Sequence, residues 1–343
     1  MSMNSKDPNS FRTSSFSKSL PDESFLYSLS LNSKNELLGA SLRRANAYFY
    51  NDLGMICIYE LWGSYFVLGD VFFIADIPKK LESIHREAIF QELLQLGISN
   101  SKRILGYYIE RPILSNQFKS YPLGFVHRRK ISKDMTKGAQ GEELRRLANL
   151  DERQDYLEYI SFSNYEDCPE DYKLLIAKVY RSFIGKQLKP YIGYLLAKPC
   201  DPISKSEKIF LMKETDSGKI SALVTAFQFG DSLYVDRLVK LTSSRMSLDL
   251  LLGRLVQHCR EQGISKLSFG LSPFYSMENH FFWKAFRKTI SFWYKAENLK
   301  KFKNKYARNK SQAYFFVEKR KSLIWNFLLL SFASVYWKID SKD

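Results

Sequence analysis

The chain has 343 residues, of which 45% are hydrophobic, so it can form two domains and has ample material for packed cores. Lysine and arginine number 52 against 36 acidic residues, and the formal net charge of +16 points to an acidic partner, either nucleic acid or an anionic membrane surface. The four cysteines are far apart, show no CxxC spacing and have few histidine neighbours, which argues against a zinc site. We expect reduced thiols in a cytosolic protein.

The amino-terminal stretch is rich in serine and lacks the continuous apolar core of a signal peptide. We therefore expect a disordered or loosely attached leader at 1–35. A helical pattern over 37–50 then leads into a first unit, which we place at 36–135. Its expected elements are strands at 55–61 and 65–74, a helix that starts at Pro78, and a strand at 103–110. Residues 111–125 read as irregular, and 127–130 form a basic cluster.

The middle of the chain predicts two helices. Residues 142–159 are highly charged, which is typical of a solvated helix that joins two halves, and residues 171–186 carry the apolar spacing of a packed helix. A short strand and loop are expected at 190–203. We place a second unit at 136–322, and its sheet starts with a strand at 208–214.

The clearest signals lie between residues 219 and 274. An apolar strand at 220–229 is followed by the turn Gly230-Asp231 and by a second strand at 233–241, which carries the adjacent charges of Asp236 and Arg237. Ser247 is a plausible N-cap of a helix that closes at Gly263. A half-buried strand then runs from Leu267 to Pro273.

The order strand, strand, helix, strand occurs in both units. The tripeptide Gly-Ile-Ser follows both expected helices, at 97–99 and at 263–265. We interpret the two segments as diverged copies of one duplicated unit, with chance similarity as the alternative, since such units are common in mixed folds. The two copies are expected to share one topology.

The carboxyl-terminal part combines aromatic, basic and apolar segments. Aromatic residues crowd 280–294, which is typical of a core or of a lipid-facing groove, and basic residues crowd 300–310. A strand is expected at 313–318. The apolar run 323–337 is about 22 Å long as a helix and too short to span a bilayer. We expect an apolar helix and tail at 323–343, which either lies in a membrane interface or packs on the protein.

Three pieces of this sequence resemble a known family. Tyr-Val-Asp-Arg at 234–237 before a helix, Leu-Ser-Phe-Gly-Leu-Ser-Pro at 267–273, and Phe-Lys-Asn-Lys-Tyr at 302–306 are similar to the catalytic domain of bacterial phosphatidylglycerol lysyltransferases. Leu-Gly-Asp at 68–70, Leu-Arg-Arg at 144–146 and Asn149 also match family positions. The resemblance covers roughly residues 37–337. It implies an α/β fold with a mixed sheet, made of two tandem GNAT-like units packed together.

The resemblance also implies a reaction, the transfer of an aminoacyl group from aminoacyl-tRNA to the hydroxyl group of a membrane lipid such as phosphatidylglycerol. This ester-to-ester exchange needs no metal and no cofactor. It needs a group that takes a proton from an alcohol, and cations or amides that hold phosphate and the developing oxyanion. The expected catalytic residues are Asp236, as base or orienting group, and Arg237. The expected substrate-binding residues are Arg245, Ser268, Gly270, Lys303 and Lys305.

Four of these residues also have a purely structural interpretation. Asp236 and Arg237 could be a strand-edge feature, and because neighbouring strand residues face opposite ways, at most one of them should face a given cleft. Lys303 and Lys305 would share one face of an extended segment, or they could belong to a solvated basic surface.

Two other functions stay open at this point. One is an N-acyltransferase that uses acyl-CoA, but the loop 242–247 before the second helix has no glycine where such enzymes need a close backbone approach to pyrophosphate. The other is a non-catalytic membrane- or RNA-binding protein. With aminoacyl-tRNA and anionic phospholipid as expected partners, we expect a cytoplasmic protein peripherally attached to the inner face of the membrane.

Overall fold

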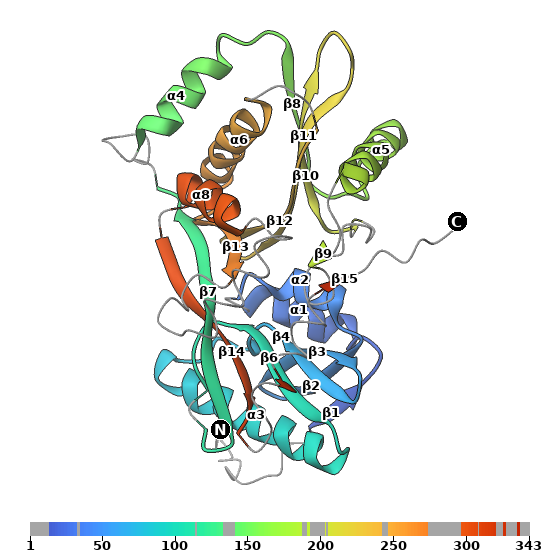
Figure 1. The fold of residues 1–343 in the computed structure, drawn as a ribbon, viewed down its shortest axis with the longest axis vertical. Helices are drawn as coiled ribbons and strands as arrows, with labels where there is room; N and C mark the ends of the chain where they lie inside the picture. Colours follow the sequence, from blue (N-terminus) through green and yellow to red (C-terminus); the bar gives the residue numbers. More distant parts are fainter. Residues whose placement is uncertain are drawn as a thin grey trace, which may run out of the picture.

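The structure is a computed structural model. It describes residues 14–32, 35–113, 115–132, 141–186, 191–192, 203, 205–241, 246–273, 296–307, 309–319, 325–326 and 335–336. Thirteen strands join into one mixed sheet that runs the length of the molecule, with helices on both faces (Figure 1).

The first half of the chain forms one end of this sheet. The strands β2, β3 and β4 are antiparallel neighbours, and β4 pairs in parallel with β6 after the crossover helix α3. The elements are β1 (Ser15–Ser17), α1 (Glu23–Asn32), α2 (Leu38–Arg44), β2 (Ala47–Asn51), β3 (Gly54–Leu61), β4 (Ser64–Leu68), β5 (Phe72–Phe73), α3 (Lys79–Ser99), β6 (Arg103–Ile109) and β7 (Phe118–Lys130).

The second half forms the other end with the same connections. The strands β10, β11 and β12 are antiparallel neighbours, and β12 pairs in parallel with β13 after the crossover helix α6. The elements are α4 (Glu142–Asp151), β8 (Leu157–Phe162), α5 (Glu170–Lys186), β9 (Tyr191–Ile192), β10 (Lys208–Glu214), β11 (Ile220–Phe229), β12 (Ser232–Lys240), α6 (Ser247–Glu261), β13 (Lys266–Pro273), α8 (Ala296–Tyr306), β14 (Asn309–Glu318) and β15 (Val335–Tyr336).

The two halves exchange strands at the centre of the sheet. The order there is β6-β14-β7-β13, so β7 of the first half lies beside β13 of the second, and β14 of the second half lies beside β6 of the first. In Figure 1, β7 and β14 run side by side between the two ends of the molecule. The two segments therefore share one strand-strand-helix-strand topology, as expected.

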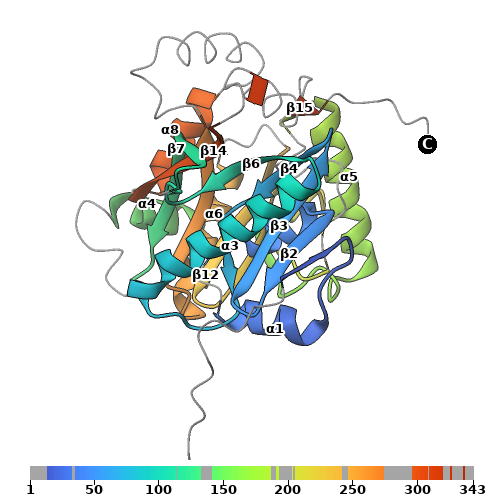
Figure 2. The ribbon, with the colours of Figure 1, turned by 90° about the horizontal axis from the view of Figure 1, so that it is seen from below.

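Alternating side chains of the strands supply separate cores on the two faces. In the second half, Phe210 and Met212 of β10 face α6, whereas Ile209 and Leu211 pack in the cluster of α5. In Figure 1, α5 and α6 accordingly lie on opposite sides of the strands. In the first half, α3 covers the face of Ile56 in β3, as Figure 2 shows from below, while α1 and α2 cover the opposite face.

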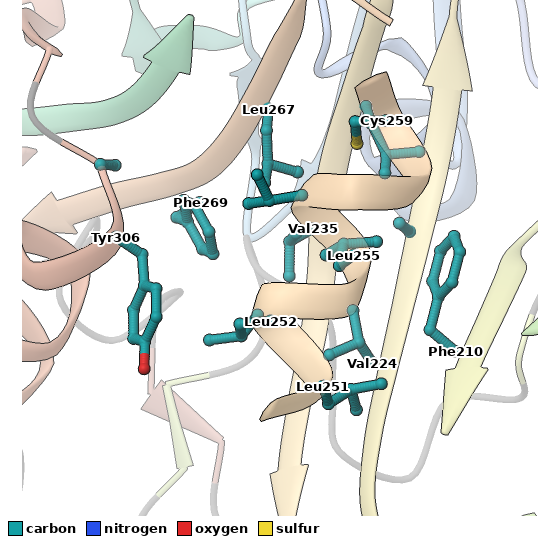
Figure 3. Packing of buried hydrophobic residues seen from close by; sticks show 14 of the residues in the cluster. Phe210, Val224, Val235, Leu251, Leu252, Leu255, Cys259, Leu267, Phe269 and Tyr306 are labelled. Atoms are coloured by element: carbon teal, nitrogen blue, oxygen red, sulfur yellow. The ribbon is translucent and has the colours of Figure 1, made fainter. Parts of the chain in front are cut away.

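The helix α6 shows how its sequence produces this packing. Its leucines recur three and four residues apart, so they form one apolar stripe that faces the sheet. Figure 3 shows Leu251 and Leu255 beside Val224 and Val235 of the strands, and Leu252 on the side of the helix toward Tyr306. Burying each such side chain contributes about 1.5–3 kcal/mol, so this stripe is what holds the helix on the sheet.

Several sequence expectations differ from the structure at the boundaries of elements. Residues 14–32 form β1 and α1, and Leu29 of α1 is fully buried, so this part of the expected leader belongs to the fold. The helix expected at 37–50 ends at Arg44, and the one expected at 142–159 ends at Asp151. In both cases a strand, β2 or β8, follows the helix. The helical pattern of the sequence concealed this strand, because tertiary pairing overrides local propensity.

Three further expectations need correction. Residues 118–130, expected to be partly irregular, form the long strand β7. Residues 335–336 form β15 against β9, so the apolar run 323–337 is not helical to its end; most of that run, like the aromatic segment 280–294, lies outside the described residues. The two Gly-Ile-Ser tripeptides are not equivalent, because Gly97 lies inside α3 whereas Gly263 follows α6 with φ +69°.

Candidate active site

Two parallel strands separate in the second half and leave a polar site between them. β12 and β13 pair only from Ser232 to Tyr234 and from Lys266 to Ser268, although both strands continue further. Beyond this point β12 stays with β11, and β13 stays with β7. Asp236 lies two residues past the last pair. Crevices at the carboxyl ends of diverging strands are the usual place for a ligand in such sheets.

A β-bulge places the Asp236 side chain. Val235 and Arg237 pair with the neighbouring residues Ala226 and Thr225 of β11, so Asp236 is the extra residue of the bulge. Bulges redirect side chains and are frequent beside active sites. The bulge also lets Arg237 Nε donate to Asp236 Oδ2 at 3.1 Å, although the two residues are adjacent in a strand.

Asp236 belongs to a buried charge cluster. Arg43 of α2 donates from Nη2 to Asp236 Oδ2 at 2.8 Å and from Nη1 to Glu207 Oε1 at 2.6 Å. The Arg237 guanidinium lies 4.9 Å from the ring centre of Tyr180 on α5. The Asp236 side chain is 4% exposed and that of Glu207 fully buried, so these charges interact with little solvent screening. The carboxylate of Asp236 is thus held in one orientation by two guanidinium groups.

Ser268 and Gly270 lie on β13 beside a second charge cluster. The Ser268 hydroxyl donates to Glu36, and the backbone N–H of Gly270 donates to Ser268 Oγ at 3.3 Å. Arg128 of β7 donates from Nε to both oxygens of Glu36 at 3.1 Å and from Nη2 to Glu110. Burial raises the pKa of the Glu110 carboxyl, an effect that the Arg128 charge opposes. Ser268 therefore ties the second half to Glu36.

Two hollows flank Glu36 and Leu37. The smaller, of about 40 Å³, contains Asp236 and Tyr234 from the second half together with Tyr108 and Arg44. The larger, of about 310 Å³, is lined by charged groups of the first half, and Arg128 and Lys266 complete it. Arg237 is not among the residues that line either hollow.

Lys303 is buried in the second half. The expectation of an extended segment is wrong, because Lys303 and Lys305 lie on the helix α8, where residues two apart point in different directions. Lys303 Nζ donates to the backbone oxygen of Leu271 at 2.8 Å and is only 6% exposed as a residue. Burial lowers its pKa to about 7, so this amine can hold or release a proton near neutral pH.

Lys305 lies in a bridge between helices. Its Nζ is 2.6 Å from Asp249 Oδ1 of α6 and 3.0 Å from Glu143 Oε1 of α4. This pairing gives it a role in joining three helices, and the role in substrate binding expected from the motif stays a prediction. Arg245 and the loop 242–245 lie outside the described residues.

The structure brings Asp236, Arg237, Ser268 and Gly270 to one region and adds residues that the sequence interpretation missed. Glu36, Arg43 and Arg44 come from the stretch around α2, which lies ahead of the repeated strands of the first unit. Tyr108 comes from a strand of the first half. A short charged helix and a tyrosine in an apolar strand carry no local signal of such a role, because long-range packing determines their positions.

Among the described residues, no group of three or more histidine, cysteine, aspartate or glutamate side chains could hold a metal ion. The helices of the described part also include none that is both long and apolar enough to cross a membrane.

The comparisons with known proteins agree on the fold. L-PGS from Bacillus licheniformis superposes with a TM-score of 0.68 at 17% identity, over 92% of this chain and 97% of that one. The C-terminal domain of a putative lysylphosphatidylglycerol synthetase from Agrobacterium fabrum gives a TM-score of 0.64 at 15% identity, over 84% and 87% of the two chains. FemX gives a TM-score of 0.53 at 9% identity, over 93% of this chain and 99% of that one. No protein-family model and no curated protein sequence matches the chain.

Proposed function

We propose that the chain is an aminoacyltransferase that moves an amino acid, such as lysine, from aminoacyl-tRNA to the hydroxyl group of a membrane lipid such as phosphatidylglycerol. The observation that carries this proposal is the oriented carboxylate of Asp236 at the point where β12 and β13 separate. The fold likeness to L-PGS and to the putative lysylphosphatidylglycerol synthetase supports it, as does the excess of 52 basic over 36 acidic residues.

The chemistry is an exchange of esters. The lipid hydroxyl oxygen bonds to the aminoacyl carbonyl carbon, the bond from that carbon to the ribose oxygen breaks, and the hydroxyl proton passes to the ribose oxygen. Asp236 orients the lipid hydroxyl by accepting its hydrogen bond, which places the attacking oxygen. Arg237 and Arg43 fix the carboxylate for this task. The Lys303 amine, whose pKa is lowered to about 7, serves the substrate-binding role expected from its motif.

The proposal includes peripheral attachment to an anionic membrane on its cytoplasmic side. It is supported by the basic run 300–310 and the apolar run 323–337, since each lysine or arginine near an anionic surface contributes on the order of 1 kcal/mol. Flotation with phosphatidylglycerol vesicles measures this attachment. If no protein floats with the vesicles at low salt, the attachment is contradicted. If protein floats with the vesicles at low salt and the floated fraction falls as salt rises, the attachment is supported.

The deciding experiment is lipid extraction from cells that express the wild-type chain, Asp236→Asn or Asp216→Asn. Asp216 lies exposed in the turn between β10 and β11 and serves as the matched control. We expect aminoacylated lipid with the wild type and the control, and at least tenfold less with Asp236→Asn. A wild-type chain that yields no aminoacylated lipid contradicts the proposal, and equal yields from all three chains contradict the role of Asp236.

An acyl-CoA-dependent N-acyltransferase is the alternative, because the diverging strands β12 and β13, which α6 connects, would also suit a pantetheine arm. Isothermal calorimetry with acetyl-CoA separates the two functions. We expect no binding at micromolar concentrations, since the loop 242–247 has no glycine. Micromolar affinity would favour the alternative.

A further inference from the structure

The smaller hollow is built by both halves of the chain. Tyr107 and Tyr108 enter it from β6 of the first half, and Tyr234 and Asp236 enter it from β12 of the second. Arg44 of α2 lines the same space. Its volume of about 40 Å³ corresponds to roughly three water molecules, which is the size of an ester group. The space therefore exists only where the two halves meet.

Tyr108 contributes a hydroxyl group that the fold does not use. The residue is 4% exposed, and its hydroxyl has no hydrogen-bond partner among the residues that the structure describes. Burial raises the pKa of the phenol well above its usual value, so the group keeps its proton and can donate it in a hydrogen bond. A buried polar group without a partner costs about 1–3 kcal/mol, which makes a purely structural purpose for this hydroxyl a poor explanation.

The backbone of Tyr108 is strained. Its φ of +63° lies in the left-handed region, which is an outlier for a bulky side chain and costs of order 1–3 kcal/mol. The cause is a bulge in which Tyr107 and Tyr108 together oppose Phe315 of β14. Strain of this kind persists when neighbouring structure enforces it, and it gathers at sites that bind ligands.

The duplicated half provides an internal comparison. In β13, the corresponding strand of the second half, Phe269 and Gly270 together oppose His127 of β7, which is a bulge of the same kind. There the left-handed position, with φ +67°, is occupied by glycine, the residue that takes it without strain. At the left-handed position of its bulge the first half has a tyrosine and the second half has glycine. Tyr108 thereby adds a side chain to a hollow that Tyr107 and Tyr234 also line.

The charge around the hollow suits a donor of this kind. Arg44 lines the hollow together with Asp236, and Arg43 and Arg237 donate hydrogen bonds to the Asp236 carboxylate. On Tyr108 itself act the charges of Glu36, Glu110 and Arg128. Hydrogen-bond donors and cations that are fixed in a water-poor site stabilise negative charge that develops on a carbonyl oxygen. A neutral phenol fixed in such a site needs no reorganisation during the reaction.

We propose that Tyr108 is a catalytic residue of the first half, and that its hydroxyl donates a hydrogen bond to the ester carbonyl oxygen of the aminoacyl donor in the hollow beside Asp236. This inference rests on the proposed function. When the lipid oxygen attacks the carbonyl carbon, the π electrons of the carbonyl group move onto the carbonyl oxygen. The hydrogen bond from Tyr108 stabilises the resulting oxyanion. The π electrons return when the bond to the ribose oxygen breaks. Tyr108 itself neither gains nor loses a proton.

The test compares Tyr108→Phe with the wild type and with Tyr27→Phe, whose hydroxyl lies on an exposed residue of α1. Loss of one oxyanion donor lowers turnover by about a hundredfold or more, and we expect this for Tyr108→Phe with Lys-tRNA and phosphatidylglycerol vesicles. The free energy of unfolding should stay the same or rise, because the variant loses no internal hydrogen bond. A fall in that free energy of more than about 1 kcal/mol would show a structural partner and overturn the inference.

A binding measurement tests the role of Tyr108 independently of whether the proposed reaction takes place. The probe is 3′-lysylamino-3′-deoxyadenosine, a stable amide that carries the same carbonyl group. We expect Tyr108→Phe to bind it about five- to tenfold more weakly than the wild type in calorimetry. A wild-type chain that transfers no lysine overturns the proposed function. Equal affinity of the two chains for the probe, or no affinity in either, overturns the role of Tyr108.

Discussion

At the scale of single residues, a few buried polar groups determine what the site can do. Lys303 places a buried amine in the second half, where it donates a hydrogen bond to the backbone oxygen of Leu271, and Asp236 is fixed by two arginines. Groups of this kind cost stability, since burial removes them from water. Their effect on the folded protein is therefore measurable without a substrate.

Lys303 should give the stability of the protein a characteristic pH dependence. Because burial lowers its folded pKa to about 7 from 10.5, the unfolded chain binds one more proton than the folded one between these two values. The free energy of unfolding should therefore rise with pH across this window, by up to about 1.4 kcal/mol per pH unit. Below pH 7 the cost of the buried charge is constant.

Denaturant titrations of Lys303→Met and of Lys310→Met, an exposed control on β14, test this expectation. The wild type and the control should gain stability relative to Lys303→Met as the pH rises from 7 to 10. Parallel curves for all three chains would show that Lys303 keeps an ordinary pKa in the fold.

At the scale of elements, close backbone contacts fix the strand exchange. A Cβ atom at Gly106 of β6 would lie 1.7 Å from the Phe316 ring of β14, so the two strands pack in a way that only glycine permits. We expect Gly106→Ala to lower the free energy of unfolding by about 3 kcal/mol, because the ring must move out of a fully packed core. Chemical denaturation measures this loss.

The double variant Gly106→Ala with Phe316→Leu identifies the contact. Since leucine lacks the ring atoms that clash, the combined loss should be clearly smaller than the sum of the two single losses. Additive losses would mean that Gly106 is needed for another reason.

Elements with local signals were predictable from the sequence, and those that depend on distant partners were not. Leucine spacing predicts the helix α6, and Gly230-Asp231 predicts the hairpin of β11 and β12. No local pattern predicts β7, because its partners are β13 and β14, which lie more than a hundred residues further along the chain. The shared topology of the two units was predicted correctly, but the Gly-Ile-Ser tripeptides do not support it, since they lie at different places in the two units.

The candidate site shows the same division. A charged pair in an apolar strand marked Asp236 and Arg237, and the motif marked Ser268 and Gly270. The bulge that directs Asp236 depends on pairing with β11, and Arg43 reaches Asp236 across 193 positions of sequence. Such contacts leave no pattern within a short window of sequence.

At the scale of the whole molecule, the strand exchange makes the two halves depend on each other. Without the second half, β6 loses β14 and β7 loses both of its partners. We expect a fragment of residues 14–135 to show no cooperative thermal transition in circular dichroism, although it contains the whole first unit with β1 and α1. The full chain is the control. A cooperative transition in the fragment would show that the first unit is an independent domain.

The position of β14 also affects the synthesis of the protein. The ribosome completes β6 at Ile109, whereas its neighbour β14 ends at Glu318, about 200 residues later. At translation rates of about 5–20 residues per second, the edge of β6 stays without its strand for roughly 10–40 seconds. During this interval its unpaired N–H and C=O groups are open to other strands. We therefore expect slower translation of the second half to increase aggregation, and a chaperone that shields the edge of β6 to reduce it.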